Sequence, residues 1–443
     1  MKIHLFDHFT YKKLLRFTVP SIAMMIFTSI YGVVDGYFVS NYVGKTPFAA
    51  VNFIYPFLMI LGAFGFMFGT GGGALIAKTM GEGNREKTKR LFSLFIYVSL
   101  GTGVLLALLG FIFLEDIAIL LGAEGEMLDN CLLYGRINLI ALPALLLQFE
   151  FQGLFITAEK PQMGLIVTIA AGVTNMVLDA VLVAFCEFGL AGAAIATAAS
   201  QCIGGLVPLV YFFCPNNSAL RLGKADFDLR SLAKGCANGA SELMTNISMS
   251  LVVMLYNFQL NEMIGEDGVA AYGVLMYVNF VFVSAYIGYS VGTAPIISYN
   301  LGAQNREELK SLLRKSTVII GVCSVLMLVV SVALAYPLSD MFVGYDEGLM
   351  ELTLHAFKIF SFSFLFAGFA IFGSSFFTAL NNGLVSAIIS FLRTLVFQVA
   401  SVWFLPMIWG IDGIWWSIVV AELMAVVLSF AFVIANRKRY GYM

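Results

Sequence analysis

Long stretches without a charged side chain are the feature that most restricts how this chain can fold. Five of them contain no Asp, Glu, Lys or Arg: residues 91–114, 188–220, 268–305, 316–339 and 359–392. An α-helix crosses the hydrocarbon core of a bilayer with about 20 apolar residues, and the three longest stretches suffice for a crossing and a turn. A core helix of a soluble protein does not show this pattern. The chain is therefore predicted to be an integral membrane protein.

The composition supports folding in a bilayer and excludes several partners. Of the 443 residues, 60% are hydrophobic and 12% are charged, against roughly 25% charged in soluble domains. The net charge of −2 provides no strongly basic surface, so nucleic acid is not an expected partner. The six cysteines stand singly without CxxC spacing, which indicates neither a zinc site nor a disulfide framework. No cofactor is expected.

Twelve membrane-spanning helices are expected, six in each half, with ends placed to within about four residues. Short connections between them use the whole length of the chain. The expected spans are residues 14–39, 47–77, 92–114, 131–157, 162–186, 190–214, 232–260, 268–299, 316–338, 352–378, 384–408 and 413–435.

An internal repeat divides the chain into two halves. Gly302 lies 221 positions after Gly81, and the same shift places the GxxNRE motif of residues 81–86 on residues 302–307. Unrelated apolar helices share Ala and Gly by chance, but they do not share a polar loop motif at one offset. The fold class is therefore an all-α membrane protein of two six-helix lobes related by duplication. An even number of spans gives both lobes the same orientation.

The predicted domains are an N-lobe over residues 1–214 and a C-lobe over residues 232–443. The segment 215–231 between them begins Pro-Asn-Asn-Ser, which is typical of a loop. It is expected to be a cytoplasmic linker.

Basic and acidic residues lie on opposite sides of this topology. Connections on one side carry Lys2, Lys12, Lys13, Arg16, Lys78, Arg85, Lys87, Lys89, Arg90, Arg221, Lys224, Arg230, Lys234, Arg306, Lys310, Arg314, Lys315, Arg437, Lys438 and Arg439. The opposite side carries Glu115, Asp116, Glu124, Glu126, Asp129, Asp340, Asp346, Glu347 and Glu351. Because positively charged connections stay in the cytoplasm, both termini are expected there.

Charged residues inside the spans are candidates for function, because a buried charge costs several kcal/mol unless it is paired or faces water. The candidates chosen are Asp35, Glu150, Asp179, Glu242, Arg393 and Glu422.

Four polar residues of the N-lobe are expected at similar depth. Asp35 lies near the outer end of the first span, Asp179 in the outer half of the fifth, and Thr197 two turns into the sixth. Asn175 lies one turn before Asp179 on the same helix face. Oxygen ligands of this kind suit a small hard cation such as Na+. They equally suit a proton relay, because burial and a neighbouring like charge favour the protonated form of a carboxyl group.

The other intramembrane charges leave alternatives open. Glu150 in the fourth span and Glu242 in the seventh are candidates for binding a cationic substrate in a central cavity. Either acid is equally suited to pairing with Arg393, the intramembrane cation of the eleventh span, and Glu422 has the same standing.

Motifs spread over nearly the whole chain carry a family resemblance. They are Pro20, Val34-Asp35-Gly36, Val43-Gly44, Ala49-Ala50, Gly81-x-x-Asn84, Asn175-x-x-Leu178-Asp179 and Gly189-Leu190-Ala191-Gly192-Ala193-Ala194-Ile195-Ala196-Thr197. The chain resembles the multidrug and toxic compound extrusion (MATE) transporters, in their DinF-like bacterial branch. There, an acid of helix 1 and polar residues of helices 5 and 6 form a cation site, and the matching motif positions are Asp35, Asn175, Asp179 and Thr197.

The resemblance implies a multidrug exporter of the bacterial inner (plasma) membrane. Two lobes would enclose a central cavity, and cationic amphipathic drugs would leave by alternating access against inward H+ or Na+. We expect a monomer with small organic cations and the lipid bilayer as partners. The acid pair in helices 7 and 10 of NorM-like relatives is not matched, because residues 352–378 contain no acid.

Three other functions fit the sequence less well. A flippase of lipid-linked saccharides from the same superfamily should carry several basic residues in the cavity for a pyrophosphate, whereas Arg393 is the one basic residue among the intramembrane candidates. A membrane-embedded enzyme is not expected, because HExxH and GxSxG motifs are absent. Duplicated lobes with a buried acidic site favour coupled exchange over a passive channel.

Overall fold

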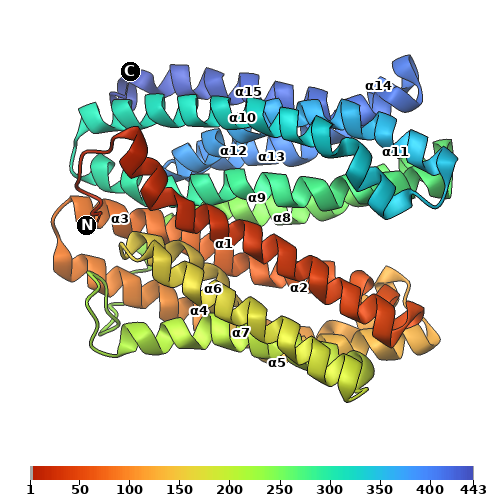
Figure 1. Ribbon diagram of the computed structural model, residues 1–443. Helices are drawn as coiled ribbons and strands as arrows, with labels where there is room; N and C mark the ends of the chain where they lie inside the picture. The colour runs from red at the N-terminus through yellow and green to blue at the C-terminus, as the bar shows by residue number, and fades with distance from the viewer. Residues whose placement is uncertain (1–2, 443) are drawn as a thin grey trace.

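The computed structural model describes residues 3–442, without the side chains of residues 33, 40, 41 and 45. The described part of the chain is helical and contains no strand. Within residues 3–442, twelve helices are long and apolar enough to cross a membrane, which confirms the expected number of spans and the all-α fold class. Both termini lie at the same end of the bundle (Figure 1).

The helices form two groups. The first contains α1 (Tyr11–Phe38), η1 (Val39–Val43), α2 (Lys45–Met67), η2 (Phe68–Gly72), α3 (Gly73–Gly81), α4 (Arg85–Leu121), α5 (Gly125–Thr157), α6 (Pro161–Leu178), η3 (Asp179–Phe185) and α7 (Gly189–Phe213). The second contains α8 (Leu229–Met263), α9 (Glu266–Gly302), α10 (Arg306–Val343), α11 (Glu347–Phe360), η4 (Ser361–Ser363), α12 (Phe364–Ala379), α13 (Gly383–Phe391), η5 (Leu392–Val396), α14 (Phe397–Trp409) and α15 (Ile411–Tyr440). We call these groups the N-lobe and the C-lobe.

The predicted ends of the third and ninth spans were wrong. Helix α4 begins at Arg85 and α10 at Arg306, before the expected starts at 92 and 316. The side chains of Asn84 and Asn305 cap these helices by accepting the backbone N–H of the third following residue, at 3.0 and 3.1 Å. Apolar content therefore located the membrane crossing, whereas the cap residue determines where the helix starts.

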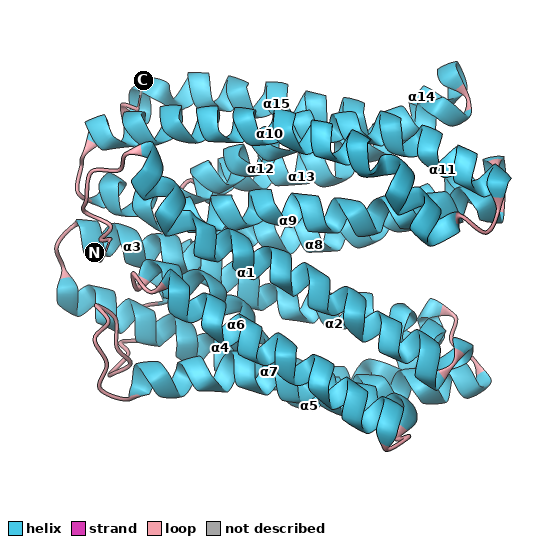
Figure 2. Cartoon of the chain, in the orientation of Figure 1, coloured by secondary structure: helices cyan, strands magenta, loops and turns pink. Residues whose placement is uncertain are grey.

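The two lobes meet at the end of the molecule that carries the termini. A Cβ atom added to Gly288 in α9 would lie 2.6 Å from the Cα of Ile22 in α1. One added to Gly239 in α8 would lie 2.0 Å from the carbonyl oxygen of Met67 at the end of α2. Toward the opposite end the ribbons of the lobes diverge (Figures 1 and 2). The arrangement is a V with its closed end at the termini.

The repeated GxxNRE motif provides part of this closed end. A Cβ atom added to Gly81 would lie 2.0 Å from the carbonyl oxygen of Tyr299, and one added to Gly302 would lie 1.9 Å from the carbonyl oxygen of Lys78. Tyr299 and Gly302 follow Lys78 and Gly81 by the same 221 positions. The duplicated motif thus forms two equivalent contacts, in which only glycine allows the helix backbones to approach so closely.

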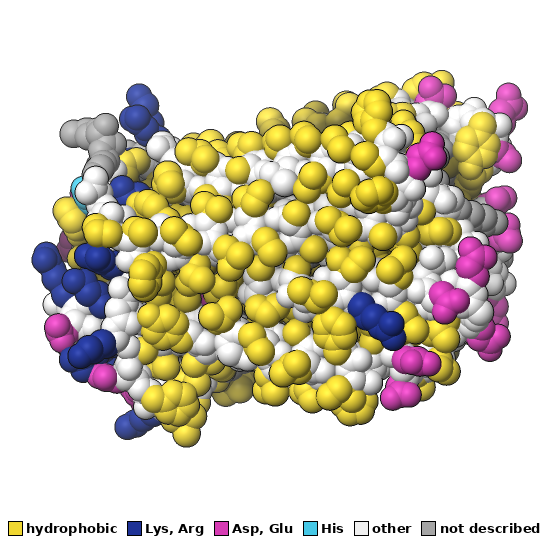
Figure 3. All heavy atoms as spheres, turned by 90° about the horizontal axis from the view of Figure 1, so that it is seen from below, with side chains coloured by type: hydrophobic (Ala, Val, Ile, Leu, Met, Phe, Trp, Pro, Cys, Tyr) yellow, Lys and Arg dark blue, Asp and Glu magenta, His cyan; other side chains and the backbone are white. Residues whose placement is uncertain are grey.

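Charge is distributed along the long axis of the molecule. Figure 3 shows a hydrophobic middle, with most Lys and Arg side chains at the end of the termini and Asp and Glu side chains gathered at the other end. A wide apolar band between two charged rims is the surface expected for a protein that spans a bilayer.

Candidate functional site

The candidate site lies in the N-lobe, where the end of α1 meets α6 and α7. Asp35 stands one turn before the end of α1, and the hydroxyl of Thr197 in α7 lies 3.5 Å from its Oδ1 atom. The same hydroxyl donates at 3.0 Å to the carbonyl oxygen of Ala193. A hydroxyl has one proton to donate, so it can serve only one of these acceptors at a time. The Thr197 hydroxyl thus lies between two acceptors, the carbonyl oxygen of Ala193 and the carboxyl group of Asp35.

Asp179 and Asn175 complete the group that the sequence selected. Both interact with the carboxyl group of Asp35, and Asp179 is the first residue of the π-helical segment η3. Both carboxyl oxygens of Asp179 and the Oδ1 atom of Asn175 are buried without a hydrogen-bond partner. Unpaired buried oxygens are unfavourable, so this group of acceptors has the chemistry to hold a proton or a small cation.

Only two carboxyl groups take part in this site. Within residues 3–442 no group of three or more His, Cys, Asp and Glu side chains could hold a metal ion. A cation at Asp35 and Asp179 would therefore depend on neutral oxygen ligands as well, which Asn175 and Thr197 provide. Two neighbouring carboxylates in a region of low dielectric do not remain ionised together, so a proton fits the same place.

Three tyrosines surround the acids and were not predicted. Tyr31 in α1, Tyr55 in α2 and Tyr134 in α5 all lie within electrostatic reach of Asp35. Tyr31 precedes Asp35 by one helical turn, a spacing that would have identified it. Tyr55 and Tyr134 come from other helices, and no sequence pattern distinguishes them from the other tyrosines.

The structure separates Glu150 from these residues. Its side chain is fully buried and neither carboxyl oxygen has a hydrogen-bond partner. Ser99 of α4 is a polar side chain with which it interacts. Glu150 is therefore held within the helices of one lobe.

The C-lobe contains a different polar group. Arg393, in the π-helical segment η5, binds Glu422 of α15 through its Nε and Nη2 atoms at 2.9 to 3.1 Å. Glu242 of α8 is half-buried and within electrostatic reach of Arg393, but no ion pair joins it to the described residues. Of the acids considered as partners of Arg393, Glu422 is thus the one bound directly.

The C-lobe position equivalent to Asp35 carries no acid. Tyr256 lies 221 positions after Asp35, and its hydroxyl donates to Oε1 of Gln398 at 2.8 Å. A neutral hydrogen bond therefore stands where the N-lobe has a carboxyl group.

Comparison with known proteins gives concordant matches. A family model described as MatE matches residues 20–181 and 243–404, so it matches once in each half of the chain. The multidrug export protein MepA of Staphylococcus haemolyticus (strain JCSC1435) is 25% identical over 431 residues, which cover 97% of this chain and 94% of that protein.

Solved structures show the same fold. A multidrug resistance MATE family transporter of the MOP superfamily, in an outward-facing conformation, matches with a TM-score of 0.93 at 21% identity and covers 98% of both chains. A MOP superfamily transporter from Pyrococcus furiosus, whose binding pocket is described as having reverse polarity, matches with a TM-score of 0.90 at 22% identity over 98% of this chain and 97% of the other.

Proposed function

Since the chain belongs to the MatE family, we propose that it is a secondary active multidrug exporter that moves small organic cations outward in exchange for H+ or Na+. The relatives are named as export proteins and not as enzymes, which agrees with the expectation that the chain is no enzyme.

The observation that carries the proposal is the N-lobe group of Asp35, Asn175, Asp179 and Thr197. Acceptor atoms from three helices converge there, and the two carboxyl groups have no basic partner among the described residues. A proton or Na+ between Asp35 and Asp179 relieves the repulsion of two buried acids. Binding and release of that ion then change the charge of the site, as coupling requires.

Helix α1 links this site to the other lobe. Asp35 stands near one end of α1, while Thr18 and Ile22 in its other half pack against Gly292 and Gly288 of α9. An ion that alters the end of α1 therefore acts on a helix that contacts both lobes. This provides a physical route from ion binding to movement of one lobe against the other.

Glu242 is the better candidate for recognising a cationic substrate. It is half-buried in α8, a helix that contacts the N-lobe at Gly239, whereas Glu150 is fully buried within one lobe. A carboxylate in a region of low dielectric attracts an organic cation strongly. Glu242 is therefore the first candidate for binding the positive charge of the substrate, and Glu150 is the second. Arg393 borders this part of the cavity, since it lies within electrostatic reach of Glu242.

A flippase of lipid-linked saccharides is less well supported. Its pyrophosphate substrate would need a free basic residue, whereas both acid oxygens of Glu422 bind Arg393. We therefore retain the exporter as the function.

Topology and assembly complete the proposal. We place the lobe boundaries at 1–214 and 232–443, joined by the cytoplasmic linker 215–231, with both termini in the cytoplasm of a bacterial cell. The chain acts as a monomer, because one copy already contains both lobes.

The decisive test is transport into proteoliposomes under an imposed proton or sodium gradient. Asp35→Asn and Asp179→Asn should each abolish gradient-driven exchange, because each removes an ionisable group of the ion site. Asp116→Asn, at an exposed position of α4, is the matched control and should transport as the wild type does. Unchanged flux in both site variants, at equal amounts of reconstituted protein, would show that the N-lobe group does not couple transport.

A further inference from the structure

The segment that precedes α1 binds both lobes through two copies of the same device. The Nδ1–H of His4 donates to Oε2 of Glu159 at 2.6 Å, and the next backbone N–H, of Leu5, donates to Oε1 at 2.8 Å. Four residues later, Nδ1 of His8 lies 2.6 Å from Oε2 of Glu308 and the N–H of Phe9 donates to Oε1 at 2.9 Å. In each clamp a histidine and the following residue hold both oxygens of one carboxylate.

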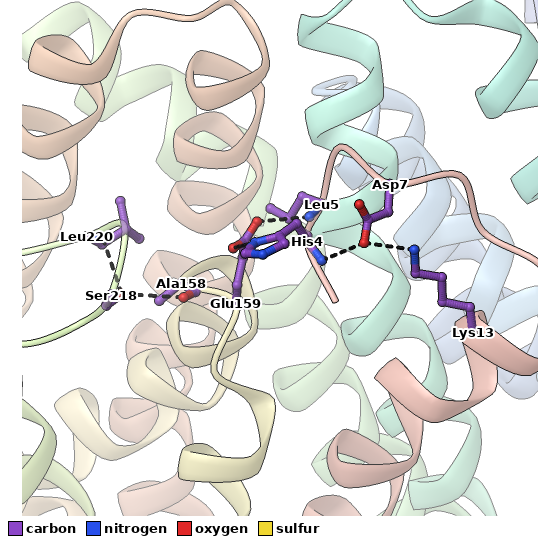
Figure 4. A network of polar contacts seen from close by, with 8 residues as sticks. All are labelled: His4, Leu5, Asp7, Lys13, Ala158, Glu159, Ser218 and Leu220. Atoms are coloured by element: carbon purple, nitrogen blue, oxygen red, sulfur yellow. Dashed lines mark hydrogen bonds and ion pairs between the residues drawn. The ribbon is translucent and has the colours of Figure 1, made fainter. Parts of the chain in front are cut away.

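The two clamps attach to different lobes. Glu159 lies between α5 and α6 of the N-lobe, and its backbone adopts a left-handed conformation with φ of 59°. Glu308 lies in the first turn of α10 in the C-lobe. Figure 4 shows the N-lobe clamp, in which His4 and Leu5 face Glu159 while Asp7 binds both the His4 backbone and Lys13.

Hydrophobic contacts hold the same segment in place. Leu5 and Phe9 are completely buried, and they belong to one apolar cluster with Ile156 of α5, Ile296 of α9 and Leu309 of α10. Lys315 of the C-lobe also donates to the carbonyl oxygen of Phe9. Residues 4–9 therefore form an ordered strap across the closed end of the V and not a loose terminus.

The length of the strap limits how far the lobes can separate. His8 follows His4 by four positions, so a fully extended chain spans at most about 14 Å between them. If the ends of α5 and α10 move apart beyond that reach, one clamp must open. We propose that residues 4–9 are a latch that holds this end of the transporter closed, with the two clamps acting in series between the lobes.

A series arrangement makes a specific prediction, which rests on the alternating access proposed above. The lobes can separate once one of the two clamps has broken. A variant that already lacks either clamp therefore opens without the free-energy cost of breaking one. His4→Ala, His8→Ala and the double variant should therefore shift the open-to-closed ratio by the same factor, about tenfold for the loss of one charge-assisted clamp. Two independent stabilising contacts would instead multiply their effects.

The measurement is the distance between the lobes at the closed end of the full-length protein in nanodiscs. Spin labels on unnatural amino acids at Gln162 and Lys438, both exposed and in different lobes, leave the six cysteines unchanged. Double electron–electron resonance then reports the populations of short and long distances. Glu308→Gln should also increase the population of the long distance. Glu307 is the exposed residue before Glu308 in the same turn, and Glu307→Gln should leave that population unchanged.

Each result has a defined meaning. Equal increases of the long distance in both single variants and in the double variant support the latch. The latch is overturned, and the exporter is left standing, if the increase in the double variant is the product of the two single increases. The same conclusion follows if the wild type shows both distances and every variant keeps the wild-type ratio. A single distance in every sample, at every pH and sodium concentration used, would overturn both the latch and alternating access.

Discussion

Intramembrane acids of this chain differ in what surrounds them, and their surroundings distinguish their roles. Asp35 and Asp179 face each other among polar oxygens, while Glu422 is bound by Arg393. Glu242 is half-buried without a direct ion pair. Sequence position alone identified all of these residues as candidates, but only the contacts separate an acid that can bind an ion from one that is already neutralised.

Glu242 provides a test of charge recognition at the level of one residue. In Glu242→Gln the purified protein should bind a fluorescent organic cation such as ethidium about tenfold more weakly, equivalent to about 1.4 kcal/mol, while binding of a neutral dye changes less. Glu150→Gln, which alters an acid buried within the N-lobe, is the comparison. Fluorescence titration in detergent measures both affinities, and equal affinity for the cation in wild type and both variants would contradict recognition by these carboxylates.

The Arg393–Glu422 pair yields a prediction about stability. Glu422→Gln leaves the arginine without its direct partner, and an unpaired buried charge costs about 3 kcal/mol. The nearby Glu242 offsets part of that cost. The apparent Tm should therefore fall by several degrees, as measured by scanning fluorimetry of purified protein. Arg393→Gln in the same chain should restore part of the loss, and an unchanged Tm in Glu422→Gln would show that the pair contributes no stability.

At the scale of helices, the sequence predicted the number of membrane spans better than it predicted where each helix begins. The twelve spans were predictable because apolar length is a direct consequence of bilayer thickness. The ends of α4 and α10 were not, because the cap at Asn84 or Asn305 lies outside the apolar stretch. Likewise, the strap was missed, since the bond between His8 and Glu308 joins residues 300 positions apart and no periodicity marks such a contact.

The duplicated glycines of the closed end give a test at this scale. Gly302→Ala places a Cβ atom 1.9 Å from the carbonyl oxygen of Lys78, so the closed arrangement must shift, at a cost of about 1–3 kcal/mol. Dye efflux from cells should fall about tenfold at equal expression. Gly273→Ala lies in the same helix with nothing within 4 Å of the added atom, and it should retain wild-type efflux. Equal efflux in the two variants would indicate that the close approach at Gly302 is not needed.

For the whole molecule, the distribution of charge indicates which end faces the cytoplasm. Lys and Arg side chains gather at the end of the termini and acidic side chains at the other end, as Figure 3 shows for one face. Because positive charge is retained in the cytoplasm during insertion, the closed end of the V is expected inside the cell and the diverging end outside. The conformation would then be open to the outside.

Two native cysteines test this orientation without engineering. Cys186, after η3, and Cys214, after α7, are both exposed, and they lie at opposite ends of α7. A membrane-impermeant maleimide added to intact cells should label Cys186 and spare Cys214, while permeabilised cells should show both labelled. Cys186→Ser should abolish the label on intact cells, whereas Cys214→Ser should not. Labelling of Cys214 alone in intact cells would reverse the topology, and it would place the strap of residues 4–9 on the outer face.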